Sequence, residues 1–243
     1  MNEIKLKENF YQYQFAPTDQ NVLGQNLYVL YGKEECIIFD AGYERHMTEL
    51  IPKLKSYKIK FVICTHFHPD HCFGLNVLPK QYVIGSTHSM ETLKMFEEED
   101  NELLVPEVLV AKPMMIRFEK HTIKLSLNPG HSKCNMLINI DDEFLLIGDD
   151  YMTTNQGEPV LPYIAYTLDA HIKSIQYIID KYKGYQLLPS HGMITNDIDK
   201  LVYRIKYLEF AKSSDKDLSN FYTKEDIPFL NERWHSINIR RDK

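Results

Sequence analysis

One short segment, residues 65–71, constrains this chain more than any other. It contains three histidines and one aspartate within six consecutive positions, directly after the apolar run at 61–64. Imidazole and carboxylate groups are the ligands that zinc and related transition metals select. The apolar run is short, uncharged and rich in β-branched and aromatic residues, which predicts a buried strand. The segment is therefore predicted to be a metal-binding loop at the end of a strand.

The spacing within this loop indicates how its side chains are shared between metal ions. His66 and His68 are two residues apart, and in an extended segment such residues point to the same side, so both imidazoles can reach one ion. Asp70 and His71 follow Pro69, which disfavours a continuing strand. They can therefore face a second, neighbouring ion. The alternative is a histidine-rich surface turn without a function, and the rest of the chain weighs against it.

Three further candidate ligands lie beside a glycine or a proline, at the end of a predicted strand. They are His131, Asp149 and His191, which follow the runs at 123–127, 144–147 and 187–188. Loops at strand ends are the usual place for functional side chains. Each of these three side chains is of a type that binds metal ions, so each is a further candidate ligand.

The motif His-x-His-x-Asp-His, followed in order by a histidine, an aspartate and a histidine, resembles the signature of the metallo-β-lactamase superfamily of metallohydrolases. The run at 35–42, which ends in Asp-x-Gly, is similar to an early strand of that family. The resemblance covers about residues 22 to 195. It implies an α+β fold, with two mixed β-sheets packed face to face and helices on both outer sides (αββα). The expected organisation is one domain over 1–243, with 213–243 as a C-terminal extension of uncertain role.

The resemblance also implies a role for each matching residue. One metal ion would be bound by His66, His68 and His131, and the second by Asp70, His71 and His191. Asp149 would bridge the two ions. Asp150 is the adjacent rival, but the bridging aspartate of the family directly follows a glycine such as Gly148. Asp40 would hydrogen-bond a ligand from behind, as metal-bound histidines require.

The activity implied by the resemblance is hydrolysis by a hydroxide that bridges two zinc ions, since each ion lowers the pKa of bound water. Asp70 and Asp149 are the candidate catalytic residues, because either carboxylate can pass a proton onward. The expected substrate is a small ester, lactone or thioester, as in the glyoxalase II and lactonase branches. Phe67 and Tyr151 are candidate pocket residues; core packing is the alternative for both.

Other functions remain open at this stage. A phosphodiesterase can use the same site. An iron-dependent oxidoreductase or dioxygenase is a second alternative, and iron or manganese can replace zinc; however, di-iron members of the superfamily typically have a glutamate where this chain has His68. A non-catalytic binding protein that retains the fold is the third alternative.

The amino-acid composition limits the kinds of partner that the protein is expected to bind. The chain has 243 residues, of which 44% are hydrophobic, and a net charge of −6, so it lacks the basic excess of a nucleic-acid-binding protein. The polar N-terminus does not resemble a targeting segment, and no apolar run is long enough to span a membrane. We therefore expect a cytoplasmic protein that acts on a small molecule. The apolar residues around Trp234 can pack on the domain, cover the substrate or mediate a homodimer.

Overall fold

The structure is a computed structural model that describes residues 1–18, 23–155, 157, 159–161, 165–213 and 235–236. The strands of the first sheet are β1 (Asn2–Lys7), β2 (Phe10–Phe15), β3 (Gln25–Tyr31), β4 (Glu35–Phe39), β5 (Lys58–Ile63), β6 (Val83–Ser86) and β7 (Val108–Val110). The second sheet contains β8 (Met114–Phe118), β9 (His121–Leu127), β10 (Met136–Ile140), β11 (Phe144–Gly148) and β14 (Gln186–Pro189). A small third sheet contains β12 (Met152–Thr153), β13 (Pro159–Leu161) and β15 (His235–Ser236). The helices are α1 (Glu44–Leu54), α2 (Pro69–Cys72), the 3₁₀ helix η1 (Phe73–Val77), α3 (Ser89–Met95), α4 (Leu168–Lys181) and α5 (Ile198–Ser213).

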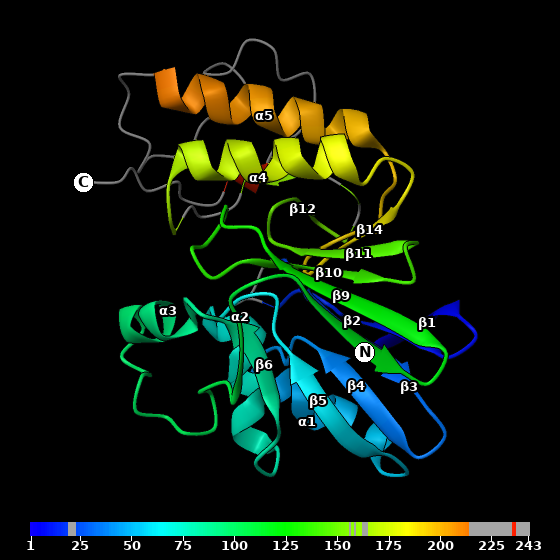
Figure 1. The fold of residues 1–243 in the computed structure, drawn as a ribbon. Helices are drawn as coiled ribbons and strands as arrows, with labels where there is room; N and C mark the ends of the chain where they lie inside the picture. The colour runs from blue at the N-terminus through cyan, green and yellow to red at the C-terminus, as the bar shows by residue number, and fades with distance from the viewer. Residues whose placement is uncertain (19–22, 156, 158, 162–164, 214–234, 237–243) are drawn as a thin grey trace.

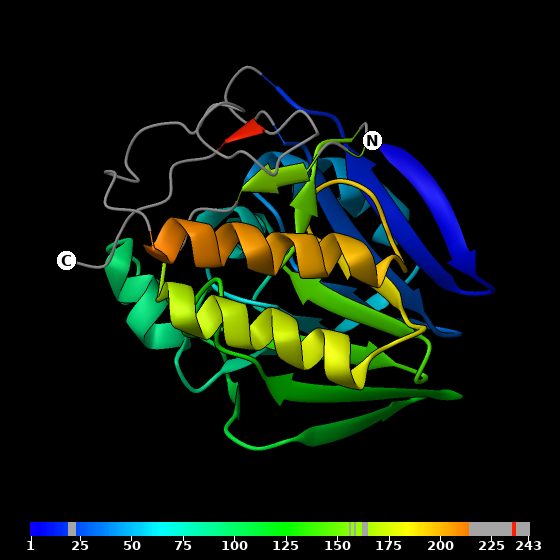
Figure 2. The same ribbon diagram turned by 90° about the horizontal axis from the view of Figure 1, so that it is seen from above.

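The two large sheets pack face to face, and helices cover both outer faces (Figure 1). The first sheet has the order β1-β2-β3-β4-β5-β6-β7, and α1 and α3 lie on its outer side. The second has the order β14-β11-β10-β9-β8 and is covered by α4 and α5, which run side by side (Figure 2). The αββα arrangement implied by the resemblance is therefore confirmed.

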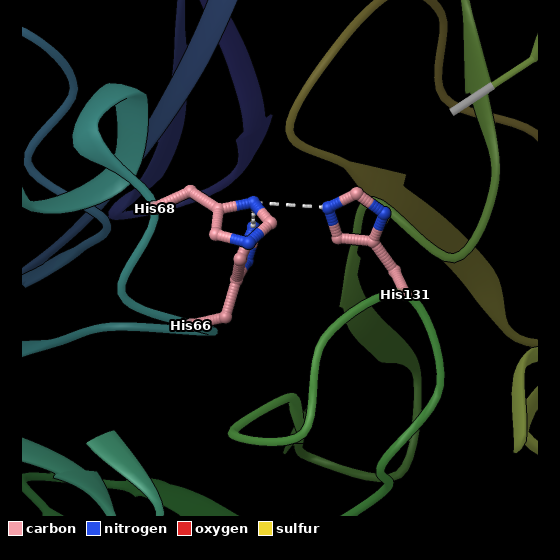
Figure 3. A group of neighbouring side chains, drawn as sticks. All are labelled: His66, His68 and His131. Carbon is pink, nitrogen blue, oxygen red and sulfur yellow. Dashed lines mark hydrogen bonds between the residues drawn. The ribbon is translucent and has the colours of Figure 1, made fainter. Parts of the chain in front are cut away.

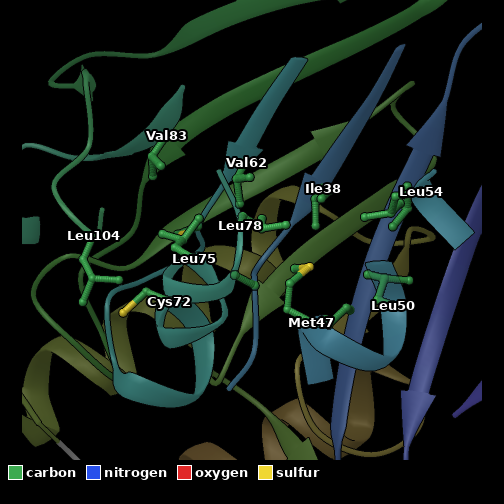
Figure 4. Packing of buried hydrophobic residues seen from close by; sticks show 14 of the residues in the cluster. Ile38, Met47, Leu50, Leu54, Val62, Cys72, Leu75, Leu78, Val83 and Leu104 are labelled. Carbon is green, nitrogen blue, oxygen red and sulfur yellow. The ribbon is translucent and has the colours of Figure 1, made fainter. Parts of the chain in front are cut away.

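Buried apolar side chains fill the interfaces between the sheets and the helices. Between the sheets, Phe10 and Ile37 of the first sheet meet residues such as Leu125 of the second. On the outer face of the first sheet, Met47 and Leu50 of α1 pack towards the strands (Figure 4). Each fully buried side chain of this size contributes roughly 1.5–3 kcal/mol. The sheets are thus a rigid base for the loops at their edges.

Strand pairing brings the candidate ligands to one edge of the sandwich. β11 and β14 are parallel, with Gly148 opposite Pro189, so the residues that follow these strands emerge side by side. β4 and β5 are also parallel, with Phe39 opposite Ile63, which places Asp40 beside the loop after β5. The strand ends therefore present Asp149, His191 and the segment 65–71 to a common region.

Some local expectations differ from the structure. The sequence pattern favours a helix over 86–104, but α3 ends at Met95 and Glu97 has a left-handed backbone with φ of 59°. Residues 98–104 form turns instead, because the acidic run adds charge without an apolar face to bury. The sequence also favours Asp169 as the cap of the next helix, but the cap of α4 is Thr167, whose hydroxyl accepts a hydrogen bond from Ala170 N at 3.1 Å.

The C-terminal extension at 213–243 lies largely outside the described residues, and so does Trp234. The single-domain organisation, the extension's role and the homodimer stay predictions for this reason. Among the helices of the described ranges, none combines the length and apolar character needed to cross a membrane.

His46 of α1 gives a prediction for the pH dependence of stability. Its side chain is 2% exposed, and its Nδ1 accepts a hydrogen bond from Tyr43 N at 3.2 Å. Burial, aided by the positive charge of Arg45, lowers the pKa of His46 from 6.5 to about 4. The neutral ring is therefore favoured by folding, and its contribution is lost as the pH falls from 6.5 towards 4.

The variant His46→Asn keeps an acceptor for Tyr43 but does not titrate. The free energy of unfolding of the native protein, relative to this variant, should fall by up to about 2 kcal/mol between pH 7 and pH 5. Urea unfolding of both proteins at the two pH values measures this difference. A pH-independent difference would show that His46 is not held neutral by the fold.

Candidate metal centre

The candidate centre is built from loops that leave four different strands. His66 and His68 lie directly after β5, while Asp70 and His71 lie in α2, which begins at Pro69. The loop between β9 and β10 supplies His131. Asp149 directly follows β11, and His191 lies just after β14. All seven predicted ligands fall into two groups, and within each group the candidate ligand atoms lie within 4.8 Å of one another. The groups are His66, His68 and His131, and Asp70, His71, Asp149 and His191.

The first group consists of three buried imidazoles. The nitrogen Nδ1 of His68 lies 3.1 Å from Nε2 of His66 and 3.1 Å from Nε2 of His131. Figure 3 shows His68 facing His131 across a narrow gap, with His66 beside His68. Burial lowers the pKa of all three rings, to about 4 for His68. They are therefore neutral at physiological pH, and each offers a lone pair.

The second group combines two carboxylates with two imidazoles. Asp70 Oδ2 lies 3.1 Å from His191 Nε2 and 3.7 Å from His71 Nε2. Burial opposes protonation of both rings, but the charge of Asp149 and its hydrogen bond to His191 outweigh this effect, so the pKa of His191 rises to about 10. The pKa of His71 also rises well above its usual value. Any metal ion bound here must displace these protons, so its affinity should increase with pH.

Asp149 lies between the two groups. Its Oδ2 atom is 3.9 Å from Nε2 of His66 and 3.6 Å from Nε2 of His131, which belong to the first group. It is 3.5 Å from Nε2 of both His71 and His191, in the second group. One carboxylate oxygen thus faces four imidazole nitrogens. This is the position required of a ligand that bridges two ions.

Asp40 supports the centre from behind. It adopts a left-handed backbone with φ of 57° and is 2% exposed. Its carboxylate accepts hydrogen bonds from Thr65 N at 2.6 Å and from Ser190 Oγ at 3.0 Å. Its Oδ2 also lies 2.9 Å from Nδ1 of His71. A proton on that nitrogen leaves Nε2 of His71 free to bind a metal ion.

Asp150 does not share the site with Asp149; it forms a separate buried network under the His131 loop. Its carboxylate accepts hydrogen bonds from the side chains of Asn128, Asn135 and Ser174, each at 3.0 Å, and from His131 N at 3.3 Å. Burial raises the pKa of Asp150 to about 7, although these hydrogen bonds oppose the shift. The sequence pattern did not reveal this network, because its members share no local motif.

Gly130 explains how the His131 loop approaches this network so closely. A Cβ atom at Gly130 would lie 2.1 Å from Ser174 Oγ and 2.7 Å from Asp150 Oδ1. Any side chain here would therefore displace the hydrogen bonds that fix the loop. The glycine before His131 is a packing requirement of the site.

The chemistry of the side chains fits metal ions. In the first group, Nδ1 of His68 lies 3.1 Å from Nε2 of both His66 and His131, and each neutral ring has a lone pair on one of its two nitrogens. Within the described residues, the buried atoms His71 Nε2 and Asp149 Oδ1 have no hydrogen-bond partner. Buried polar atoms without partners are costly. A cation in the second group, once it has displaced the protons held there, would provide a partner for both atoms, and a cation in the first group would accept the lone pairs of its three rings.

A cleft of about 420 Å³ opens over the centre. Asp70, His131 and Asp149 form its polar floor, while Leu23, Tyr43, Phe96 and Met152 supply apolar walls. Phe67 and Tyr151, the candidate pocket residues of the sequence analysis, are both buried. Phe67 is buried against Gly85, and Tyr151 is 1% exposed beneath the guanidinium of Arg204, so neither lines the cleft.

Comparison with known proteins identifies the family. The model of the metallo-beta-lactamase superfamily matches residues 21–149, more than half of the 243 residues. The chain belongs to this superfamily. In fold it is similar to a metallo-beta-lactamase from Pontibacter korlensis (TM-score 0.70, 19% identity, covering 86% of this chain and 98% of that one). A metallo-beta-lactamase from Hirschia baltica gives a TM-score of 0.63 at 18% identity, covering 85% and 96%.

Two curated relatives are not named as metallo-beta-lactamases. The chain is 26% identical to hydroxyacylglutathione hydrolase of Francisella philomiragia over 138 residues, which cover 56% of this chain and 51% of that protein. It is 25% identical to ribonuclease Z of Thermococcus onnurineus over 174 residues, which cover 69% and 48%. The chain thus spans about half the length of the curated relatives it matches.

Proposed function

We propose that this protein is a binuclear, zinc-dependent hydrolase of small esters, lactones or thioesters. The observation that carries the proposal is the position of Asp149 Oδ2, within 3.9 Å of imidazole nitrogens from both ligand groups. One ion would be held by His66, His68 and His131, and the other by Asp70, His71 and His191. Zinc is favoured over iron because His68 stands where di-iron relatives have glutamate. The proposed location is the cytoplasm.

The residues around the centre would each have a defined role. Zinc ions, when bound, would supply a water of lowered pKa and polarise the substrate. Asp40 fixes the ring of His71, and the Asp150 network fixes the loop that carries His131. The side chain of Asp70 is 22% exposed at the cleft floor, where it can accept a proton during the reaction. The apolar walls would hold the uncharged part of a substrate and exclude water.

The substrate class can be tested with a small panel. A hydroxyacylglutathione thioester, p-nitrophenyl butyrate, a lactone and bis-p-nitrophenyl phosphate would be assayed with the zinc-loaded protein. We expect turnover of the thioester or the carboxylic esters. This turnover should be lost when a chelator removes the zinc. Turnover of the phosphodiester alone would contradict the proposal. The similarity to a protein named ribonuclease Z makes a phosphodiesterase the second candidate.

A further inference from the structure

A second cavity, of about 340 Å³, adjoins the cleft at His68. Its lining includes Glu91 and Met95 of α3, and Lys133 from the loop after His131. His68 lines both this cavity and the cleft. The two cavities therefore share a wall at His68, a residue of the first ligand group.

The two cavities differ in their charged side chains. In the described part of the chain, no lysine or arginine lines the cleft, whereas Lys133 lines the second cavity. The Lys133 side chain is 38% exposed, so its ammonium is accessible to a ligand. Tyr166 also lines this cavity. The second cavity is thus the one suited to an anionic group.

Lys133 is paired with Glu91, and the geometry of this pair leaves it able to bind a ligand. Its Nζ lies 2.6 Å from Glu91 Oε2, while Oε1 of the same carboxylate lies 3.0 Å from Nδ1 of His88. The Glu91 side chain is 54% exposed, and exposed pairs contribute little to stability. An ammonium has three donors, so Lys133 can bind a ligand carboxylate beside Glu91 or in its place.

We propose that this second cavity is a subsite for an anionic group of the substrate, with Lys133 as the residue that binds it. The inference rests on the proposed function and narrows its substrate class to esters or thioesters that carry a carboxylate. Lys133 is a specificity-determining residue. Glu91 competes with the substrate for the ammonium of Lys133 and therefore limits the affinity of the protein for the substrate.

Binding of two matched acids tests the subsite without turnover. Both butyrate and glutarate can place one carboxylate at the metal centre, but only glutarate has a second for Lys133. Isothermal titration calorimetry of the metal-loaded protein should show tighter binding of glutarate. Lys133→Met should reduce this preference about tenfold, the worth of a charge-assisted hydrogen bond. Glu91→Gln should increase it.

Lys94→Met is the matched control, because Lys94 is exposed on α3, the helix that supplies Glu91, but lines neither cavity. It removes the same charge and should keep the native preference. A preference that survives Lys133→Met, or that falls equally in Lys94→Met, would overturn the subsite.

Kinetics with mono-p-nitrophenyl glutarate and p-nitrophenyl butyrate separate the two proposals. The ratio of their kcat/KM values should fall about tenfold in Lys133→Met. If neither ester is hydrolysed while the glutarate preference still depends on Lys133, the subsite is supported and the esterase function is contradicted. If both esters are hydrolysed with the same ratio in all variants, the function stands and the subsite is wrong.

Discussion

Asp149→Asn is expected to abolish the binding of two metal ions per chain and to reduce hydrolysis at least about 100-fold. The amide keeps the shape of the side chain but removes the charge that faces four imidazole nitrogens at 3.5–3.9 Å. Changes to groups that only support ligands already cost about 10–100-fold, so loss of the shared ligand should cost at least as much. Metal content and turnover, measured on the same preparation, test this result.

A suitable control is Asp180→Asn, since Asp180 accepts a hydrogen bond from Gln176 on the exposed surface of α4. It should keep native metal content and activity. The variant His68→Ala should also lose metal and turnover together. Unchanged activity in Asp149→Asn would show that this carboxylate does not bridge the reacting centre.

Asp40→Asn is expected to weaken metal binding by about 10–100-fold while the fold is retained. Asparagine tolerates the left-handed backbone at this position, where φ is 57°. The amide nitrogen of the new side chain would take the place of Oδ2, which contacts His71 Nδ1 and the hydroxyl of Ser190. An amide nitrogen cannot accept a hydrogen bond, so the N–H on His71 Nδ1 would lose its acceptor. The His71 ring would then favour the tautomer with its proton on Nε2, the nitrogen needed for the metal.

The hairpin residue Asp141 offers a matched control. It also has a left-handed backbone, with φ of 58°, and its Oδ2 lies 2.6 Å from Nδ1 of His121. Asp141→Asn makes the same change to an aspartate–histidine pair outside the centre. Competition with a chelator measures metal affinity in both variants. Equal affinities would mean that the contact between Asp40 and His71 does not orient a ligand.

Local sequence patterns and the resemblance to the superfamily together predicted most of the candidate site. The spacing in residues 65–71 indicated two sets of ligands, and the resemblance to the superfamily, whose bridging aspartate follows a glycine, distinguished Asp149 from Asp150. Both distinctions agree with the observed groups, in which Asp149 joins Asp70 and His191 while Asp150 lies elsewhere. The first was predictable because ligands at strand ends form a short polar motif beside an apolar run, and the second because the superfamily has a glycine before its bridging aspartate.

Features that depend on contacts between distant residues were not predictable. The partners of Asp150 come from residues 128, 135 and 174, and no local pattern links them. Phe67 alternates with two ligands, but this position does not show that its ring turns into the core beside Gly85. The second cavity likewise joins α3 to the loop after His131, which only the tertiary structure brings together.

The most direct test of a binuclear zinc centre is elemental analysis of protein purified without added metal, expressed per chain. The two ligand groups and the shared position of Asp149 predict about two zinc ions per chain. Iron in their place would contradict the use of His68 to select zinc and would direct the search to redox chemistry. A chain that binds no metal, even after zinc is supplied, would contradict the account as a whole.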